Sequence, residues 1–207
     1  MFWKVFPWIL AAVVILIGSY AWVERVSNYS VLTDPFVLFP VLGIWAWSVM
    51  WTHFVIDEIR RFKPKLPKNI QYKKTSFVFV LFCILLHPGL LIYAQYEAGL
   101  GLSLANAYVG AARMWAVQIA VIAFFIFLSF EFFDRMRENP KVEKKWWIVN
   151  ISQSVAMILI FIHSLTLGTH LQQGWFSIYW ILLGIILAGC IIHTHITDWN
   201  YFRKKSP

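Results

Sequence analysis

The chain has 207 residues, of which 60% are hydrophobic and 14% charged, and its formal net charge is +8. Soluble domains are about half apolar and about a quarter charged, so this composition excludes a chain made mainly of soluble domains. Several apolar runs are long enough to cross a bilayer, and we expect an integral membrane protein. Cys83 and Cys190 lie in separate apolar runs without a CxxC motif, which predicts neither a disulfide framework nor a redox pair.

Six apolar segments predict an all-α, six-helix transmembrane bundle that forms one domain over residues 1–207. Each segment is close to the roughly 20 residues that a helix needs to cross the hydrocarbon core. The expected spans are residues 5–23, 36–56, 76–96, 114–133, 148–168 and 176–196. The apolar part of the first span is longer than that of a typical signal peptide. We therefore expect a retained helix there, with a cleaved signal peptide as the alternative.

Basic residues are distributed unevenly between the two ends of the expected helices. All lysines and arginines except Arg25 and Arg113 precede the first span or follow the second, fourth or sixth. The positive-inside rule then places both termini in the cytoplasm. The same placement accounts for the net charge, so the expected partner is the lipid bilayer and not nucleic acid.

Two of the six histidines lie deep within expected spans. His87 interrupts the apolar run CILLHPGLLI (83–92) of the third span, and His163 lies in the fifth. Ionisable side chains at this depth usually face the protein interior and have a partner there. Helical bundles build cofactor sites from side chains on facing helices, and we expect His87 and His163 to be the axial ligands of one haem. The alternative is that each histidine is structural and bonded to a neighbouring helix.

The other four histidines lie nearer the membrane surface. His170 follows His163 by seven residues on the same helical face, and it is a candidate contact for haem propionates or an outer electron acceptor. A surface histidine in a loop is an equal alternative. His53, with either His193 or His195, is a candidate for a second, inner ligand pair, although interfacial histidines are common. His193 and His195 are two residues apart, so they cannot both face one site.

Two segments resemble a known family of membrane haem proteins. LLHPGLLIYAQY (85–96) and WWIVNISQSVAMILIFIHSLTLGTHLQQGW (146–175) are similar to the third and fifth helices of the ferric reductase-like transmembrane domain. Ferric reductases, NADPH oxidases and related bacterial cytochromes share this domain, which typically holds two haems between four histidines. His87 and His163 match the outer pair, whereas Lys73 and Asn150 stand at the inner positions. The resemblance therefore implies a single haem b.

The resemblance implies a membrane b-type cytochrome of the bacterial inner membrane that transfers electrons through this haem. No residue of the sequence is a candidate catalyst in its own right. The family's flavin and NAD(P)H domains are absent, so an oxidoreductase component of this kind needs a separate electron donor protein or a quinol. The alternative is a non-redox membrane protein, either a small transporter or a structural subunit of a membrane complex. That alternative predicts buried histidines bonded to neighbouring helices.

Overall fold

Long helices dominate a computed structural model of the chain, which describes residues 2–26, 34–101, 109–172 and 174–205 and contains no strand among them. In lipid, backbone polar groups must bond within the chain, and an apolar segment achieves this by forming a helix. The six long helices are α1 (Phe2–Glu24), α2 (Pro35–Phe62), α3 (Ile70–Glu97), α5 (Met114–Arg135), α7 (Trp146–Leu167) and α8 (Trp175–Lys205). All six contain a stretch long and apolar enough to cross a membrane, which confirms the predicted fold class and makes this an integral membrane protein.

Three of these helices exceed the lengths that the sequence predicts by seven residues or more. The α2 helix continues past Ile56 to Phe62, α3 begins at Ile70, and α8 extends to Lys205. The apolar run marks only the part of a helix that lies in the hydrocarbon core, whereas the helical backbone continues through polar residues beyond it. Ion pairs accompany these extensions, such as the one between Asp57 and Lys73, whose nitrogen and oxygen are 2.7 Å apart.

The described chain divides into two compact units. The first comprises Met1–Leu104 with His170–Pro207, and the second comprises Ala105–Thr169. The prediction of a single transmembrane domain stays a prediction.

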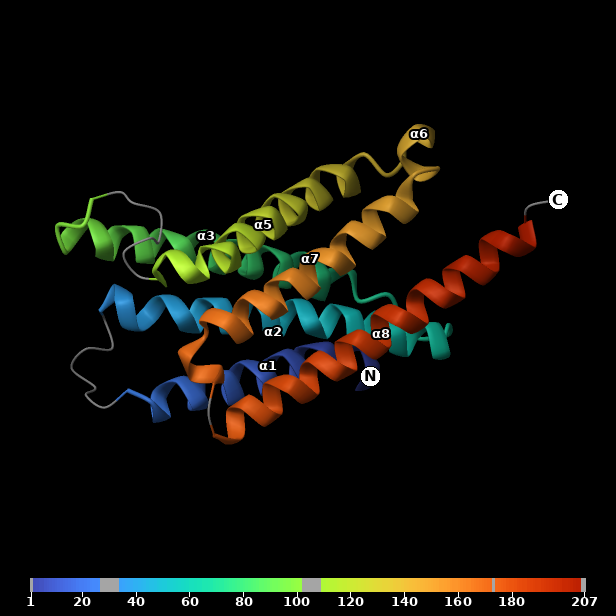
Figure 1. The fold of residues 1–207 in the computed structure, drawn as a ribbon. Helices are drawn as coiled ribbons and strands as arrows, with labels where there is room; N and C mark the ends of the chain where they lie inside the picture. Colours follow the sequence, from blue (N-terminus) through green and yellow to red (C-terminus); the bar gives the residue numbers. More distant parts are fainter. Residues whose placement is uncertain (1, 27–33, 102–108, 173, 206–207) are drawn as a thin grey trace. The chain divides into compact units, whose positions relative to one another are not determined.

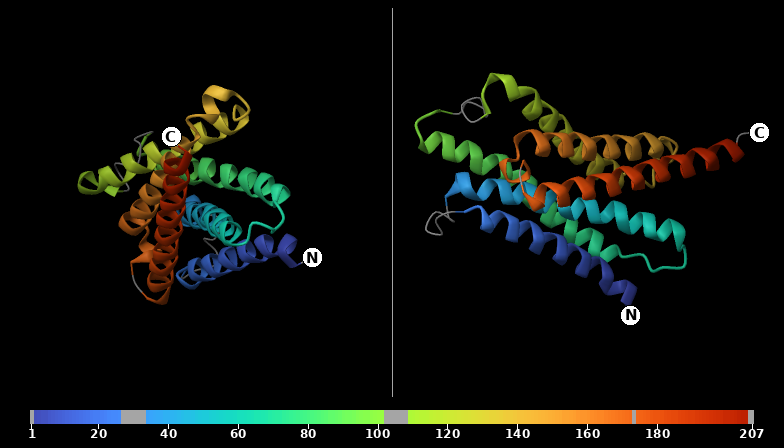
Figure 2. Two further views of the ribbon diagram at one scale, coloured as in Figure 1. Left: turned by 90° about the vertical axis from the view of Figure 1, so that its right-hand side faces the viewer. Right: turned by 60° about the horizontal axis from the view of Figure 1, so that its bottom comes forward.

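In the first unit, α2 packs against α1, α3 and α8 (Figures 1 and 2). The α2 helix is accordingly the most buried of the four, and its Trp47 is only 1% exposed. The Trp47 ring packs against Trp180 of α8, with ring centroids 4.4 Å apart. Trp51 adds a hydrogen bond from its indole nitrogen to the backbone oxygen of Leu183, 2.8 Å away. Aromatic side chains thus fix α8 against α2.

Contacts at the two ends of this unit show the relative directions of its helices. At one end, Trp175 at the start of α8 donates a 2.8 Å hydrogen bond to Glu24 at the end of α1. At the other end, the Lys63 ammonium that follows α2 lies 5.3 Å from the Trp3 ring near the start of α1. The helices α1 and α2 therefore run antiparallel, and the basic residues that follow α2 gather with the start of α1.

Glycines allow two close approaches of neighbouring helices to α2. A Cβ atom added at Gly18 of α1 would lie 2.6 Å from the Ile44 side chain. A Cβ atom added at Gly43 would lie 3.0 Å from Cε1 and 3.1 Å from Nδ1 of His87 on α3. Small residues at helix interfaces allow backbones to approach closely in membrane proteins, and Gly43 thereby makes room for an imidazole.

The second unit is a helical hairpin. The helices α5 and α7 pack side by side and are connected through the single-turn helix α6 (Pro140–Glu143), and the 3₁₀ turn η2 (Ala111–Arg113) precedes α5 (Figure 1). Ala116 and Ala123 of α5 and Ala156 of α7 are completely buried. Alanines at these positions let the two helices approach closely.

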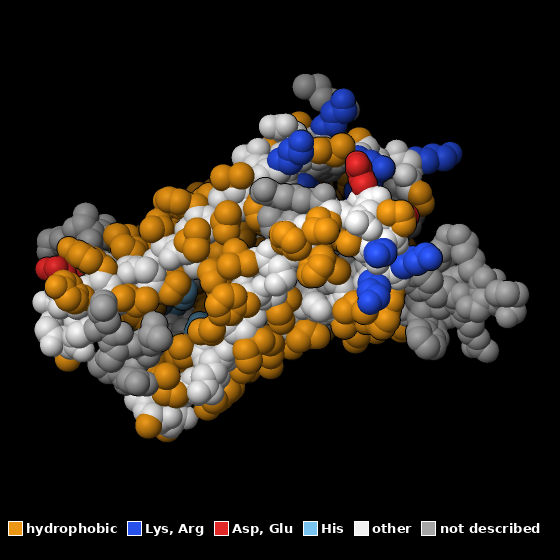
Figure 3. Space-filling view, turned by 90° about the horizontal axis from the view of Figure 1, so that it is seen from above, with side chains coloured by type: hydrophobic (Ala, Val, Ile, Leu, Met, Phe, Trp, Pro, Cys, Tyr) orange, Lys and Arg blue, Asp and Glu red, His pale blue; other side chains and the backbone are white. Residues whose placement is uncertain are grey.

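Large apolar side chains remain exposed along the spans. Leu16 of α1, Ile178 and Ile185 of α8 are each more than 60% exposed, at 67%, 65% and 62%. Figure 3 shows hydrophobic side chains over most of the face in view. In a bilayer, such side chains contact lipid chains instead of water, so this surface agrees with the predicted lipid bilayer partner.

We predict that Gly43→Ala destabilises the first unit, because its methyl group would meet the His87 ring. Overpacking of this kind costs about 1–3 kcal/mol, and the thermal unfolding midpoint of the detergent-purified protein should fall. The matched control is Gly89→Ala on α3, where an added Cβ has nothing within 4 Å. Equal midpoints for Gly43→Ala and the unsubstituted protein would show that the ring does not occupy this position.

Candidate functional site

His87 of α3 is bound to the main chain of α2. Its Nδ1 atom lies 2.6 Å from the backbone oxygen of Phe39. A carbonyl oxygen only accepts, so Nδ1–H is the donor. The imidazole also packs on the Phe39 ring, with centroids 5.3 Å apart. The half-buried imidazole therefore has a main-chain acceptor for its N–H group, and this contact joins two helices of the first unit.

His163 makes the same kind of contact in the second unit. Its Nδ1 atom lies 2.9 Å from the backbone oxygen of Ala116, so the imidazole of α7 donates to α5. This is the arrangement that the non-redox alternative predicts for buried histidines. His87 and His163 lie in different units, and their pairing as ligands stays a prediction.

Two of the three inner histidines have separate surroundings. His53 hydrogen-bonds through Nε2 to the Ser76 hydroxyl of α3, 2.7 Å away. His193 of α8 forms an ion pair with Glu58 of α2 when its ring is protonated, and its ring stacks on Phe62 at 4.8 Å. The structure gives His53 and His193 different partners.

Glu58 anchors a polar cluster that the sequence analysis missed. Its side chain is 9% exposed and accepts a 2.9 Å hydrogen bond from the Thr194 hydroxyl of α8. Arg61 lies 3.9 Å from the same carboxylate and 2.8 Å from Asp198. Because the predicted second span ended at Ile56, Glu58 fell in a solvated loop, and only the observed length of α2 places it against α8.

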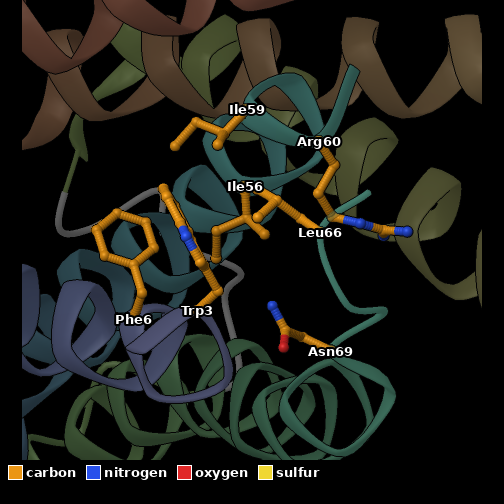
Figure 4. A pocket seen from close by; sticks show the side chains of 7 residues that line it. All are labelled: Trp3, Phe6, Ile56, Ile59, Arg60, Leu66 and Asn69. Atoms are coloured by element: carbon orange, nitrogen blue, oxygen red, sulfur yellow. The ribbon is translucent and has the colours of Figure 1, made fainter. Parts of the chain in front are cut away.

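The cavity drawn in Figure 4 is too small for a ligand. Its volume of about 10 Å³ is close to the minimum that a single water needs. Trp3 and Phe6 of α1 face Ile56 of α2 there, while the Arg60 guanidinium extends away from the two aromatic rings (Figure 4). This cavity is a packing gap between α1, α2 and the start of α3.

A much larger pocket lies within the second unit. Its volume is about 450 Å³, within the range of roughly 300–1,000 Å³ that is usual for small-molecule sites. Helices α5, α6 and α7 all contribute to it, and most of the contributed side chains are apolar. The lining residues are Ile126, Ser129, Phe130, Phe133, Lys141, Val142, Lys145, Ile148, Val149 and Ser152.

The polar groups of this pocket are two ammonium groups and two hydroxyls. Lys141 and Lys145 belong to the connection between α5 and α7, whereas Ser129 and Ser152 lie further into the helices. The Ser129 hydroxyl donates to the Phe125 backbone oxygen at 2.8 Å. Among the residues that the structure describes, no carboxylate lines the pocket, and no group of three or more His, Cys, Asp or Glu could hold a metal ion.

Comparison with known protein families finds a similarity over part of the chain. Residues 113–191 match the family described as RTA1 like protein. This segment includes every residue that lines the larger pocket, but it is less than half of the chain, so it shows a similarity and not membership. No curated protein and no solved structure matches the chain.

The match corrects the function that the sequence analysis implied. Residues 146–175, which carried part of the resemblance to the ferric reductase-like domain, lie inside the RTA1-like segment. That resemblance was wrong, and a b-type cytochrome that transfers electrons from a donor protein or quinol is not supported. The bacterial inner membrane is likewise unsupported, because the matched family is eukaryotic. The ligand roles of His87 and His163 and the haem contact of His170 have not been tested.

His170 occupies a short 3₁₀ turn, η3 (Thr169–Leu171), before α8. Its Nδ1 atom is buried and has no hydrogen-bond partner among the described residues. Burial, and then the positive charge of Arg25, lower the pKa of His170 below its usual value of 6.5. The folded protein thus favours the neutral ring.

This lowered pKa predicts a loss of stability in acid. The unfolded chain binds the proton more tightly than the folded protein, so stability falls as the pH drops through and below about 6.5. His170→Gln removes this contribution, and its unfolding midpoint should fall less between about pH 7.5 and about pH 5.5 than that of the unsubstituted protein. Thermal unfolding in detergent at several pH values measures how the midpoint of each protein changes with pH. An equal change in the two proteins would contradict the assignment of this acid sensitivity to His170.

We also predict that Glu58→Ala destabilises the first unit, because it leaves His193 and Arg61 without their shared carboxylate. Hydrogen bonds to charged groups contribute about 1.5–3 kcal/mol, and a loss of this size is expected in detergent unfolding. Asp57→Ala is the control, since its pair with Lys73 is 45% and 41% exposed and such pairs contribute only about 0.2–1 kcal/mol. Equal losses in the two variants would show that the Glu58 cluster is as solvated as the Asp57 pair.

Proposed function

We propose that the protein is a non-redox membrane protein of the small-transporter class, and that the α5–α6–α7 pocket holds its solute. The pocket itself carries this proposal. It is the larger of the two cavities described above, it is wide enough for a small molecule, and it lies inside the RTA1-like segment.

The chemistry of the pocket favours an amphiphilic solute. Its apolar walls come from two helices that are apolar enough to span the bilayer, while its ammonium groups lie where those helices join. A molecule with an apolar chain and a polar head satisfies both parts of this lining. A small polar solute would leave the phenylalanine and isoleucine side chains without an apolar partner.

The proposal includes an orientation with both termini in the cytoplasm. In the second unit, Arg137, Lys141, Lys144 and Lys145 lie at the α6 end, whereas Arg113 precedes α5 at the other. In the first unit, Arg60 and Lys63 lie beside the start of α1, and Arg25 lies just after its end. The positive-inside rule assigns the basic end of each unit to the cytoplasm. The pocket then opens toward the cytoplasmic leaflet.

Transfer of fluorescent phospholipids in proteoliposomes tests the transporter function. Vesicles carrying NBD-labelled phosphatidylcholine and phosphatidylserine are treated with dithionite, which bleaches only the outer leaflet. The protein should speed the loss of inner-leaflet signal, and Val149→Trp should slow it roughly tenfold, equal to about 1.4 kcal/mol in the barrier. The larger side chain fills the pocket that Val149 lines.

Ile151→Trp is the matched control, because Ile151 lies on the same helix, is 39% exposed and does not line the pocket. Its transfer rate should equal that of the unsubstituted protein. Rates equal to those of protein-free vesicles would contradict the transporter class and favour a structural subunit. Equal rates for both tryptophan variants would contradict the assignment of this pocket.

A further inference from the structure

The charges at one end of the α5–α6–α7 pocket specify a ligand class. Building on the proposed function, we infer that the pocket binds an anionic phospholipid of the cytoplasmic leaflet. The lipid phosphate lies at Lys141 and Lys145, and an acyl chain lies along the apolar walls of α5 and α7. No ligand class for this pocket follows from the RTA1-like match alone.

The connection between α5 and α7 presents both lysines to the pocket, Lys141 from α6 and Lys145 from the N-cap position of α7. Asn139 caps the α6 turn, and its side chain accepts a 3.0 Å hydrogen bond from the backbone nitrogen of Lys141. Pro140 starts the turn with a fixed backbone angle. The Lys145 backbone nitrogen lies 3.0 Å from the Val142 oxygen, which continues the turned backbone into α7. The two lysines are four residues apart, and both side chains line the same pocket.

In the part of the chain that the structure describes, neither lysine forms an ion pair. The neighbouring Arg137 is already engaged, because its guanidinium lies 4.4 Å from the Trp146 ring. Two ammonium groups therefore stand at a pocket whose other polar groups are hydroxyls. This arrangement attracts an anion and repels a cationic amphiphile.

The apolar walls extend the site into the bilayer. Ile126 and Phe133 on the α5 wall are seven positions apart, or about 10 Å along the helix. This is roughly a third of the hydrocarbon core, enough for part of one acyl chain. Phe130 lies between them on the same wall. A free phosphate or a soluble phosphoester would contact only the lysines. A phospholipid would contact the lysines through its phosphate and the apolar walls through its acyl chain.

General attraction of a basic loop to anionic lipid is the competing explanation. It makes every lysine of the loop equivalent, because the surface potential acts on charge and not on position. A ligand in the pocket instead predicts unequal contributions of the lysines to lipid binding. Lys144 is exposed and carries the same charge between the other two, but it does not line the pocket.

Native mass spectrometry of the full chain in detergent tests the inference, with added dioleoylphosphatidylglycerol or dioleoylphosphatidylcholine. We expect one tightly bound phosphatidylglycerol per chain and at least about fivefold weaker binding of phosphatidylcholine. Lys141→Ala and Lys145→Ala should each weaken phosphatidylglycerol binding about five- to tenfold. Lys144→Ala should leave it unchanged, and millimolar glycerol 3-phosphate should not displace the lipid.

Different failures have different meanings. Equal binding of the two lipids, or equal losses in the Lys141→Ala and Lys144→Ala variants, overturns the anionic ligand class. If Val149→Trp still weakens binding of both lipids in that case, the pocket remains an amphiphile site and the proposed function survives. If no lipid binds to the chain, both the ligand class and the amphiphile pocket are overturned. Displacement by glycerol 3-phosphate would replace the lipid with a soluble phosphoester.

Discussion

Polar groups inside a bilayer have no water to bond with, and this constraint determines most of the contacts in the structure. The helices satisfy their own main chains, and buried side chains then use main-chain oxygens as acceptors. Ser154 donates to the carbonyl one turn back on its own helix, whereas Trp22 and Trp51 donate to the carbonyls of neighbouring helices. Side-chain donors paired with main-chain acceptors therefore hold together helices that carry few charges.

The same rule accounts for the deep histidines. An imidazole in the hydrocarbon core needs an acceptor for its N–H group, and the backbone oxygens of Phe39 and Ala116 supply one to His87 and His163. Each contact joins neighbouring helices within one unit. Charged groups follow a different rule, since Glu58 and its partners gather at the basic ends of α2 and α8. Histidines thus tie the spans together at depth, and ion pairs do so near the surface.

The sequence was sufficient for the spans and insufficient for the sites. Runs of about twenty apolar residues have few structural solutions, so the six helices could be located from hydropathy. Helix ends were placed too early because charged residues such as Arg60 continue the α2 helix beyond the apolar run. A histidine that donates to a carbonyl and one that ligates haem give the same sequence pattern, so the sequence alone does not distinguish these two roles for His163. The pocket was not foreseeable, since it depends on how residues from three elements pack around one space.

The glycines of the first unit have a mechanical consequence. Gly43 receives the His87 ring from α3, while its neighbour Ile44 fits against Gly18 of α1. Two consecutive residues of α2 therefore pack against different neighbours, Gly43 against α3 and Ile44 against α1. Rotation or sliding of α2 would drive a side chain into a backbone on one side or the other. The helices α1, α2 and α3 are thus expected to move as one rigid body.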